Sequence, residues 1–238
     1  MDRARRDGLR VSADLYPWEY WQSTVRTLVA PEKLGDRDAW RAGIDAVGGA
    51  DRVRVATFSP EPRWQGKTLD ILARELGKSP ADVAMEMVRR AEAGGGRESV
   101  VVSAMRSEDI AVFARHPEVA FCSDGGLRGA HPRGAGSFPR VLGRLVREQR
   151  VLGLEDAVRK MTSLPADILG LRGRGRVHAG QVADLVCFDP RTVVETSTIG
   201  SPQSPPKGVD TVLVNGVPVV RGGRVLSTRP GIGLRRIP

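Results

Sequence analysis

Cysteine and histidine are both scarce in this chain of 238 residues. The two cysteines, Cys122 and Cys187, are too few for a disulfide framework, so we expect a protein of the reducing cytoplasm. The three histidines are His116, His131 and His178, and the sequence contains no His-x-His or Cys-x-x-Cys pair. A hydrolytic zinc site takes about three protein ligands and one open position. Residue spacing alone therefore does not indicate a metal site.

Long apolar runs and aromatic side chains are also in short supply. No run approaches the roughly 18 apolar residues that a membrane helix needs, and no apolar stretch typical of a signal peptide follows the first residues. Aromatic residues make up only 5% of the chain, which is too few for a platform on which nucleic acid bases stack. The net charge of +9 comes mainly from scattered arginines. We therefore expect neither a membrane nor a nucleic acid as a partner.

The remaining composition and the sequence patterns favour an α/β fold. The apolar fraction of 40% is enough for the core of one large domain or two small ones. Alternating or continuous apolar runs predict strands over residues 9–16, 52–58 and 99–103. Helical spacing predicts helices at residues 38–47, 69–76, 81–91, 107–115, 140–150 and 154–162. The glycine- and arginine-rich stretch that ends at Pro139 is expected to be a loop.

Short β runs replace this pattern after Gly170. They cover residues 184–188, 211–214 and 217–220, with glycines and prolines between them. The pair Asn215-Gly216 lies between two of these runs and is the strongest short-range signal for a β-hairpin. We expect a small all-β unit, distinct from the α/β part.

One turn carries a lone carboxylate. The apolar run 119–121 predicts a short buried strand, and Asp124 follows it just before a pair of glycines. In (β/α)₈ barrels the chemistry lies at the C-terminal ends of the strands. Asp124 is therefore a candidate reacting group. The alternative is an aspartate that caps a helix or satisfies the turn.

Longer motifs follow one another along nearly the whole chain. They are Ser12-Ala13-Asp14-Leu15-Tyr16-Pro17, Gly66-Lys67-Thr68-Leu69, Ser123-Asp124-Gly125, His131-Pro132-Arg133, Gly136-Ser137-Phe138-Pro139-Arg140, Lys160-Met161-Thr162-Ser163-Leu164-Pro165, Ala183-Asp184-Leu185-Val186, Leu213-Val214-Asn215-Gly216 and Arg229-Pro230-Gly231. In this order they resemble the N-acyl-D-amino-acid deacylases (D-aminoacylases) of the amidohydrolase superfamily. The chain is similar to the C-terminal portion of these enzymes.

This resemblance implies the C-terminal part of a (β/α)₈ amidohydrolase barrel with a small insertion and a C-terminal β-sandwich segment. Residues 1–170 would form the partial barrel, and the insertion would lie at about 60–112. Residues 171–238 would form the β-sandwich segment. Residues 11–16 and 119–122 would be the seventh and eighth barrel strands.

The resemblance also implies a zinc-dependent hydrolase that removes the acyl group from N-acyl-D-amino acids. Asp124 would be the catalytic carboxylate, which contacts the metal and moves the proton. Arg133 would hold the α-carboxylate of the substrate, because a planar guanidinium binds both carboxylate oxygens at once. His131 is expected to shape this loop rather than to bind metal.

The chain departs from the family in its metal ligands, because the other family ligands belong upstream of the motifs found here. We therefore expect either a truncated enzyme or one half of a split protein, completed by a missing N-terminal half or in a homo-oligomer. Two alternatives remain for the function. One is a related amidohydrolase that acts on cyclic amides, such as a dihydroorotase- or hydantoinase-like enzyme. The other is a non-catalytic remnant that acts as an interaction module.

Overall fold

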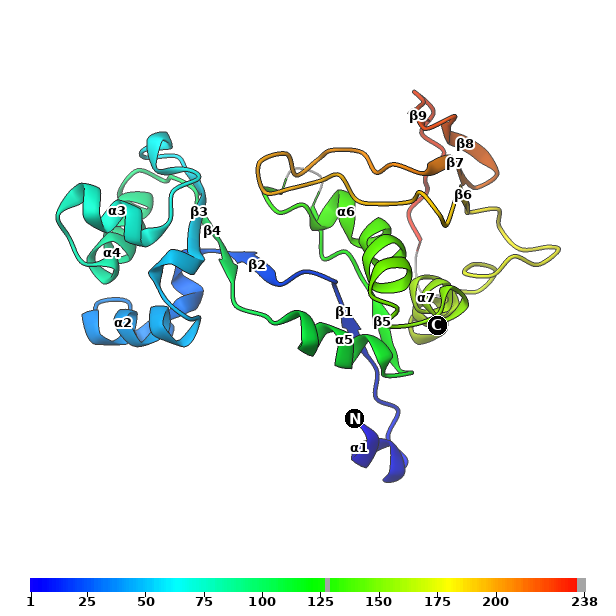
Figure 1. The fold of residues 1–238 in the computed structure, drawn as a ribbon, viewed down its shortest axis with the longest axis horizontal. Coiled ribbons are helices and arrows are strands. Elements are labelled where there is room, and N and C mark those ends of the chain that lie inside the picture. Colours follow the sequence, from blue (N-terminus) through cyan, green and yellow to red (C-terminus); the bar gives the residue numbers. More distant parts are fainter. Residues whose placement is uncertain (127–128, 235–238) are drawn as a thin grey trace. The chain divides into compact units, whose positions relative to one another are not determined.

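The computed structural model describes residues 1–126 and 129–234 (Figure 1). The chain divides into two compact units. Unit 1 consists of Met1–Pro17 and Ser107–Pro238, and unit 2 consists of Trp18–Arg106. The family resemblance implied an insertion at about 60–112, whereas unit 2 already starts at Trp18. Within the described ranges, no helix combines the length and the apolar character needed to cross a bilayer.

Unit 2 packs helices against a three-stranded antiparallel sheet in the order β2-β4-β3. Its core includes Trp40, Phe58 and Met87, which are fully buried. The elements in chain order are β2 (Tyr20–Ser23), η1 (Val25–Leu28), η2 (Pro31–Lys33), α2 (Arg37–Ala46), η3 (Ala50–Arg52), β3 (Val53–Phe58), η4 (Pro62–Trp64), α3 (Leu69–Leu76), α4 (Pro80–Ala93) and β4 (Glu98–Ser103).

The helix boundaries of unit 2 follow local sequence chemistry. Helix α3 ends at Gly77, whose φ of +61° is the left-handed conformation that glycine adopts without strain. Helix α4 begins after Ser79, whose Oγ accepts a hydrogen bond from Asp82 N, and Pro80 occupies the first turn. Strand β2 was not predicted, because its aromatic side chains do not alternate with polar ones.

Unit 1 contains a parallel strand pair, a set of helices and a separate sheet. Its elements in chain order are α1 (Asp2–Arg6), β1 (Ala13–Leu15), α5 (Ser107–Arg115), β5 (Val119–Phe121), α6 (Arg133–Arg140), η5 (Val141–Glu148), α7 (Leu154–Met161), α8 (Ser163–Leu169), β6 (Leu185–Phe188), β7 (Val209–Val214), β8 (Val217–Arg221) and β9 (Arg224–Val225). Strand β1 is shorter than the predicted 9–16.

Strand β5 of the parallel pair lies in a small core, whereas β1 contributes only the half-buried Leu15 to it. Phe121 of β5 belongs to one buried cluster with Val141 and Leu145 of η5 and Ala157 of α7, and Leu15 of β1 packs against it. Because these helices cover the strands, every residue of β5 is buried. The core thus fixes the two strand ends from which the candidate site is built.

The expectation of a loop up to Pro139 was wrong in its second half. Helix α6 begins at Arg133, and Gly136 N donates a hydrogen bond to Pro132 O at 2.8 Å to start it. Pro139 lies inside this helix, where it has no N–H to donate. The chain continues directly into the wide π-type turns of η5, which accommodate the disturbed hydrogen bonding.

The β runs of the C-terminal part form one four-stranded antiparallel sheet in the order β6-β7-β8-β9. The predicted hairpin is confirmed, because β7 and β8 pair directly across Asn215 and Gly216. These two residues have φ values of +48° and +78°, as a type I′ turn requires.

Candidate functional site

The carboxyl ends of β1 and β5 meet at one edge of the parallel pair. Asp14 is paired with Ala120, and Leu15 with Phe121. Beyond the last pair, Cys122 N donates a hydrogen bond to Leu15 O at 3.0 Å. Since parallel strands end on the same side, the segment after β1 and the turn after β5 are neighbours there.

This edge brings together the two site residues that the sequence analysis selected. Arg133 Nη1 lies 2.9 Å from Asp124 Oδ2, so the side chains form an ion pair. The side chain of Arg133 is 15% exposed, whereas that of Asp124 is 57% exposed. Arg133 is also the first residue of α6, where the helix dipole adds to its positive potential. The geometry thus presents an accessible carboxylate beside a largely buried guanidinium.

The turn that carries Asp124 is conformationally special. Asp124 has a φ of +45°, which a non-glycine residue adopts rarely. The next residue, Gly125, lies against the start of α6, and a Cβ there would come within 2.2 Å of Gly134 Cα. Only a glycine at position 125 allows this close approach, which holds the turn against the helix end that carries Arg133.

Tyr16 is a site residue that the sequence analysis did not select. The Arg133 guanidinium carbon lies 5.2 Å from the centre of the Tyr16 ring, within the range of a cation–π contact. Burial raises the pKa of the Tyr16 phenol, although the nearby Arg133 opposes this shift. The signal in the sequence was the position of Tyr16, one residue beyond the end of β1.

His131 supports this arrangement from the buried side. It is 2% exposed, and its ring meets that of Tyr16 edge-on, with the ring centres 6.0 Å apart. Its Nδ1 accepts a hydrogen bond from Arg133 N at 3.0 Å. His131 therefore shapes the loop that leads into α6.

Cys122 lies next to two carboxylates at the same edge. Burial, together with the charges of Asp14 and Asp124, raises the pKa of the Cys122 thiol to about 11. The side chain therefore stays a neutral thiol at pH 7, and a neutral thiol is a poor metal ligand and nucleophile.

The described residues do not fit a zinc ion by themselves. Among them, no group of three or more His, Cys, Asp or Glu side chains is placed to hold a metal. His116 Nε2 lies 2.9 Å from Asp2 Oδ1, and His178 Nδ1 lies 2.9 Å from Ala179 O. Asp124 is thus not joined by these two histidines, and the zinc site implied by the resemblance is not formed by the donors seen here.

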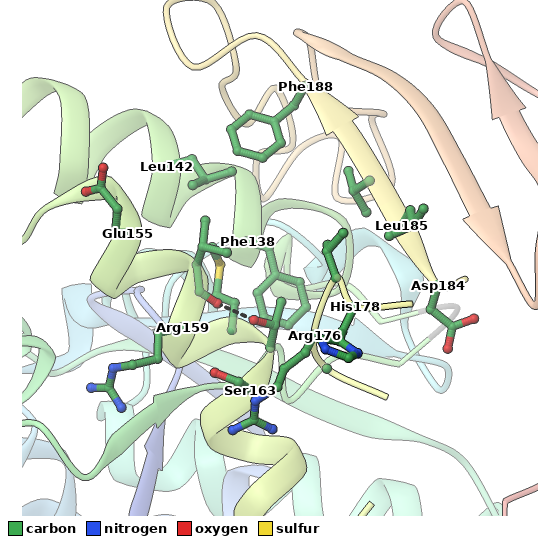
Figure 2. Close-up of a pocket in the computed structure, with 16 residues that line it drawn as sticks. Phe138, Leu142, Glu155, Arg159, Ser163, Arg176, His178, Asp184, Leu185 and Phe188 are labelled. Atoms are coloured by element: carbon green, nitrogen blue, oxygen red, sulfur yellow. Dashed lines mark hydrogen bonds between the residues drawn. The ribbon is translucent and has the colours of Figure 1, made fainter. Parts of the chain in front are cut away.

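A cavity of about 800 Å³ lies elsewhere in unit 1, between the helices and β6 (Figure 2). Its walls are mainly apolar, and Phe138, Leu142 and Phe188 point into it. The two arginines in its lining are already paired, Arg159 with Asp156 and Arg176 with Asp167. Neither Asp124 nor Arg133 lines this cavity, so it is separate from the candidate site.

A carboxylate and an arginine at the carboxyl edge of adjacent parallel strands are typical of the active sites of α/β enzymes. The chain belongs to the amidohydrolase family, whose model Amidohydro_3 matches residues 66–220. Within that family its curated relatives are deacylases of N-acylated D-amino acids. The resemblance drawn from the sequence motifs is therefore confirmed.

Two relatives from Alcaligenes xylosoxydans xylosoxydans illustrate the similarity. The chain is 36% identical to an N-acyl-D-glutamate deacylase over 238 residues, which covers 99% of this chain and 43% of the relative. It is 40% identical to a D-aminoacylase over 172 residues, which covers 71% of this chain and 34% of the relative. The chain thus spans less than half the length of these relatives.

Solved structures of the same group share the fold. An N-acyl-D-glutamate deacylase from Bordetella bronchiseptica, complexed with zinc and a phosphonate mimic of the tetrahedral intermediate, aligns with a TM-score of 0.74 at 33% identity and covers 92% of this chain and 41% of that one. A D-aminoacylase mutant in complex with copper chloride aligns with a TM-score of 0.80 at 30% identity, over 98% and 44% of the two chains. The chain therefore has the mixed helix and sheet structure of the amidohydrolase fold.

Proposed function

We propose that this chain is part of a metal-dependent amide hydrolase that removes the acyl group from N-acyl-D-amino acids. The activity is that of the complete enzyme. Strands β1 and β5 act as the seventh and eighth strands of its barrel, with residues 1–170 as the partial barrel and an insertion at about 60–112, most of which lies in unit 2. The sheet β6–β9 belongs to a β-sandwich segment at residues 171–238.

The contact of Arg133 with Tyr16 and Asp124 is the observation that carries this proposal. A partly buried guanidinium at a helix start is suited to bind a carboxylate with two hydrogen bonds. The Tyr16 ring holds one side of the guanidinium, which reduces its freedom before the ligand arrives. An α-carboxylate on Arg133 would displace Asp124, whose side chain is 57% exposed and is solvated by water after the exchange.

Asp124 is then free to act on the amide group of the same substrate. A carboxylate at this edge would take up a proton from the water that attacks the carbonyl carbon, and would deliver it to the amine that leaves as the C–N bond breaks. Zinc or copper is present in structures of similar proteins. Asp124 is proposed as one ligand of such a metal, and the remaining ligands lie outside the donors seen here.

Hydantoin-type cyclic amides are the less favoured substrates, because their ring incorporates the α-carboxyl group and offers Arg133 no free α-carboxylate. The cytoplasmic location and a homo-oligomeric or two-part assembly remain predictions from the sequence. The experiment below also tests the alternative that the chain is a non-catalytic remnant acting as an interaction module.

The test compares ligand binding with turnover on the purified chain. N-acetyl-D-glutamate should bind more tightly than its α-carboxamide, and Arg133→Ala should abolish this preference. Loss of one charge-assisted contact predicts a drop of about tenfold or more. Zinc content and hydrolysis are measured in parallel, with Asp124→Asn as the control for the reacting carboxylate. If the unaltered chain bound N-acetyl-D-glutamate and its α-carboxamide equally well, the proposal that Arg133 binds the α-carboxylate would be wrong.

A further inference from the structure

The segment between β6 and β7, residues 189–208, forms a long two-armed strap in unit 1 (Figure 1, orange). Val194 and Lys207 form an antiparallel bridge across its arms. Val193, Glu195 and Ser197 are buried and alternate with more exposed residues, as in a strand with one inward face. The strap lies close to η5, because a Cβ on Gly143 would come within 2.9 Å of Val193 O.

Glu195 is the charged residue on this inward face. Its side chain is 3% exposed, and Oε1 accepts hydrogen bonds from Arg140 Nη1 at 2.9 Å and from Arg144 Nε. Its Oε2 is a buried oxygen with no hydrogen-bond partner among the described residues. A carboxylate buried this deeply is retained only where its charge is compensated, here by two arginines.

Glu195 and Ser197, the inward polar residues of the strap, are both connected by hydrogen bonds to the backbone beside the candidate site. Arg140, held by Glu195, donates from Nε to Pro17 O at 2.6 Å, and Pro17 follows Tyr16 directly. Ser197 Oγ donates to Pro132 O at 3.3 Å, and Pro132 precedes Arg133 directly. Ser197 directly, and Glu195 through Arg140, therefore hold the backbone next to both members of the cation–π pair.

We propose that Glu195 is a positioning residue for the carboxylate site, acting through Arg140 on Tyr16 while Ser197 fixes the backbone beside Arg133. This inference rests on the proposed function for its biological meaning, but its geometric content is independent of any substrate. Without the negative charge at residue 195, the buried Arg140 guanidinium loses its ion pair with Glu195 and is no longer held against Pro17 O. The Tyr16 ring then moves relative to Arg133.

The first test reads the Tyr16 ring directly. The chain contains only two tyrosines, Tyr16 and Tyr20, so Tyr20→Phe with fluorotyrosine labelling leaves one ¹⁹F resonance. Arg133→Ala defines the shift that follows loss of the cation–π contact. Glu195→Gln, which keeps the shape of the side chain but removes its charge, should move the resonance in the same direction.

Arg144→Gln is the matched control. It removes the other partner of the same Glu195 oxygen. The side chain of Arg144 is 47% exposed, whereas Pro17 O and Pro132 O are bound by Arg140 and Ser197. The Tyr16 resonance should stay within its linewidth in this variant. Ser197→Ala provides a second, milder change, and it carries the test if Glu195→Gln does not fold by circular dichroism.

The second test measures the preference for N-acetyl-D-glutamate over its α-carboxamide. Glu195→Gln should reduce this preference about fivefold or more, as expected when a charge-assisted contact is misaligned, and Arg144→Gln should not. A folded Glu195→Gln or Ser197→Ala chain with an unmoved Tyr16 resonance overturns the positioning role. A moved resonance in a chain that has no carboxylate preference to lose refutes the proposed function instead, and leaves the positioning role standing.

Discussion

Lys160 of α7 is fully buried and should be a measurable support of the strand that leads to Asp124. Its ammonium group donates hydrogen bonds to His116 O, at the end of α5, and to Val119 O of β5 at 3.1 Å. Replacement by methionine keeps an unbranched side chain, one heavy atom shorter, and removes both hydrogen bonds. We predict a net loss of stability for Lys160→Met.

The size of this stability loss follows from the two backbone carbonyls that Lys160 binds. His116 O keeps a second partner, Val119 N at 3.2 Å, whereas Val119 O loses the Lys160 donor. A buried carbonyl without a partner costs about 1–3 kcal/mol, and a bond from a charged donor contributes about 1.5–3 kcal/mol. Relief from burying an ammonium group offsets part of this loss. We expect the free energy of unfolding to fall by roughly 1–3 kcal/mol.

The pH dependence gives a second signature. Burial lowers the pKa of Lys160 below the ordinary value of 10.5. Between the folded-state pKa and 10.5, the unfolded chain therefore binds more protons than the folded chain. Stability contributed by this group rises with pH across that window and is constant below it. Lys160→Met should remove the rise.

The assay is urea unfolding followed by two probes. All four tryptophans lie in unit 2, so their fluorescence follows that unit, whereas labelling of the Cys122 thiol in a Cys187→Ser background follows unit 1. The thiol midpoint should fall in Lys160→Met while the tryptophan midpoint stays unchanged. Lys207→Met, at an exposed position of unit 1, is the control and should change stability by about 0.5 kcal/mol at most. Unchanged thiol labelling in Lys160→Met would refute the reasoning.

Two further predictions concern the turn after β5. Because its pKa is raised to about 11, the half-buried Cys122 should react with iodoacetamide at pH 8 far more slowly than the exposed Cys187. Mass spectrometry of the alkylated chain measures both rates, and equal rates would contradict the raised pKa of the Cys122 thiol. Gly125→Ala should destabilise unit 1 by about 1–3 kcal/mol in the same urea assay, because its Cβ would overlap Gly134 Cα. Gly126→Ala, which meets no atom within 4 Å, is its control, and equal effects of the two would exclude the close approach.

The sequence predicted elements whose signals are local. The apolar run 119–121 and the pair Asn215-Gly216 carry their conformation in a few residues, and the structure contains the strand and the hairpin there. Asp124 was selected from its place after a predicted strand and Arg133 through the family resemblance, and the structure places their charged groups 2.9 Å apart. Their roles in binding and catalysis remain proposals.

The sequence failed where distant contacts outweigh local preference. Glycine and proline between 133 and 140 indicated a loop, yet α6 forms because Ser137 and Arg140 are buried against the rest of unit 1. Tyr16 was assigned to the end of a strand and nothing more, because its partner Arg133 is more than a hundred residues away. No short-range pattern reports such a contact.

The supports of the candidate site share one chemical device, which explains why they are hard to recognise. Buried polar side chains bind backbone carbonyls beside the functional residues or on the strand that leads to them, as Arg140 does at Pro17, Ser197 at Pro132 and Lys160 at Val119. Every residue has a backbone carbonyl, so the residue whose carbonyl is bound carries no sequence signature of its own. The information lies in the donor, which appears in the sequence as an ordinary arginine, serine or lysine on a helix or loop. Only burial of these donors, at 8%, 3% and 0% exposure, distinguishes them from surface residues of the same type.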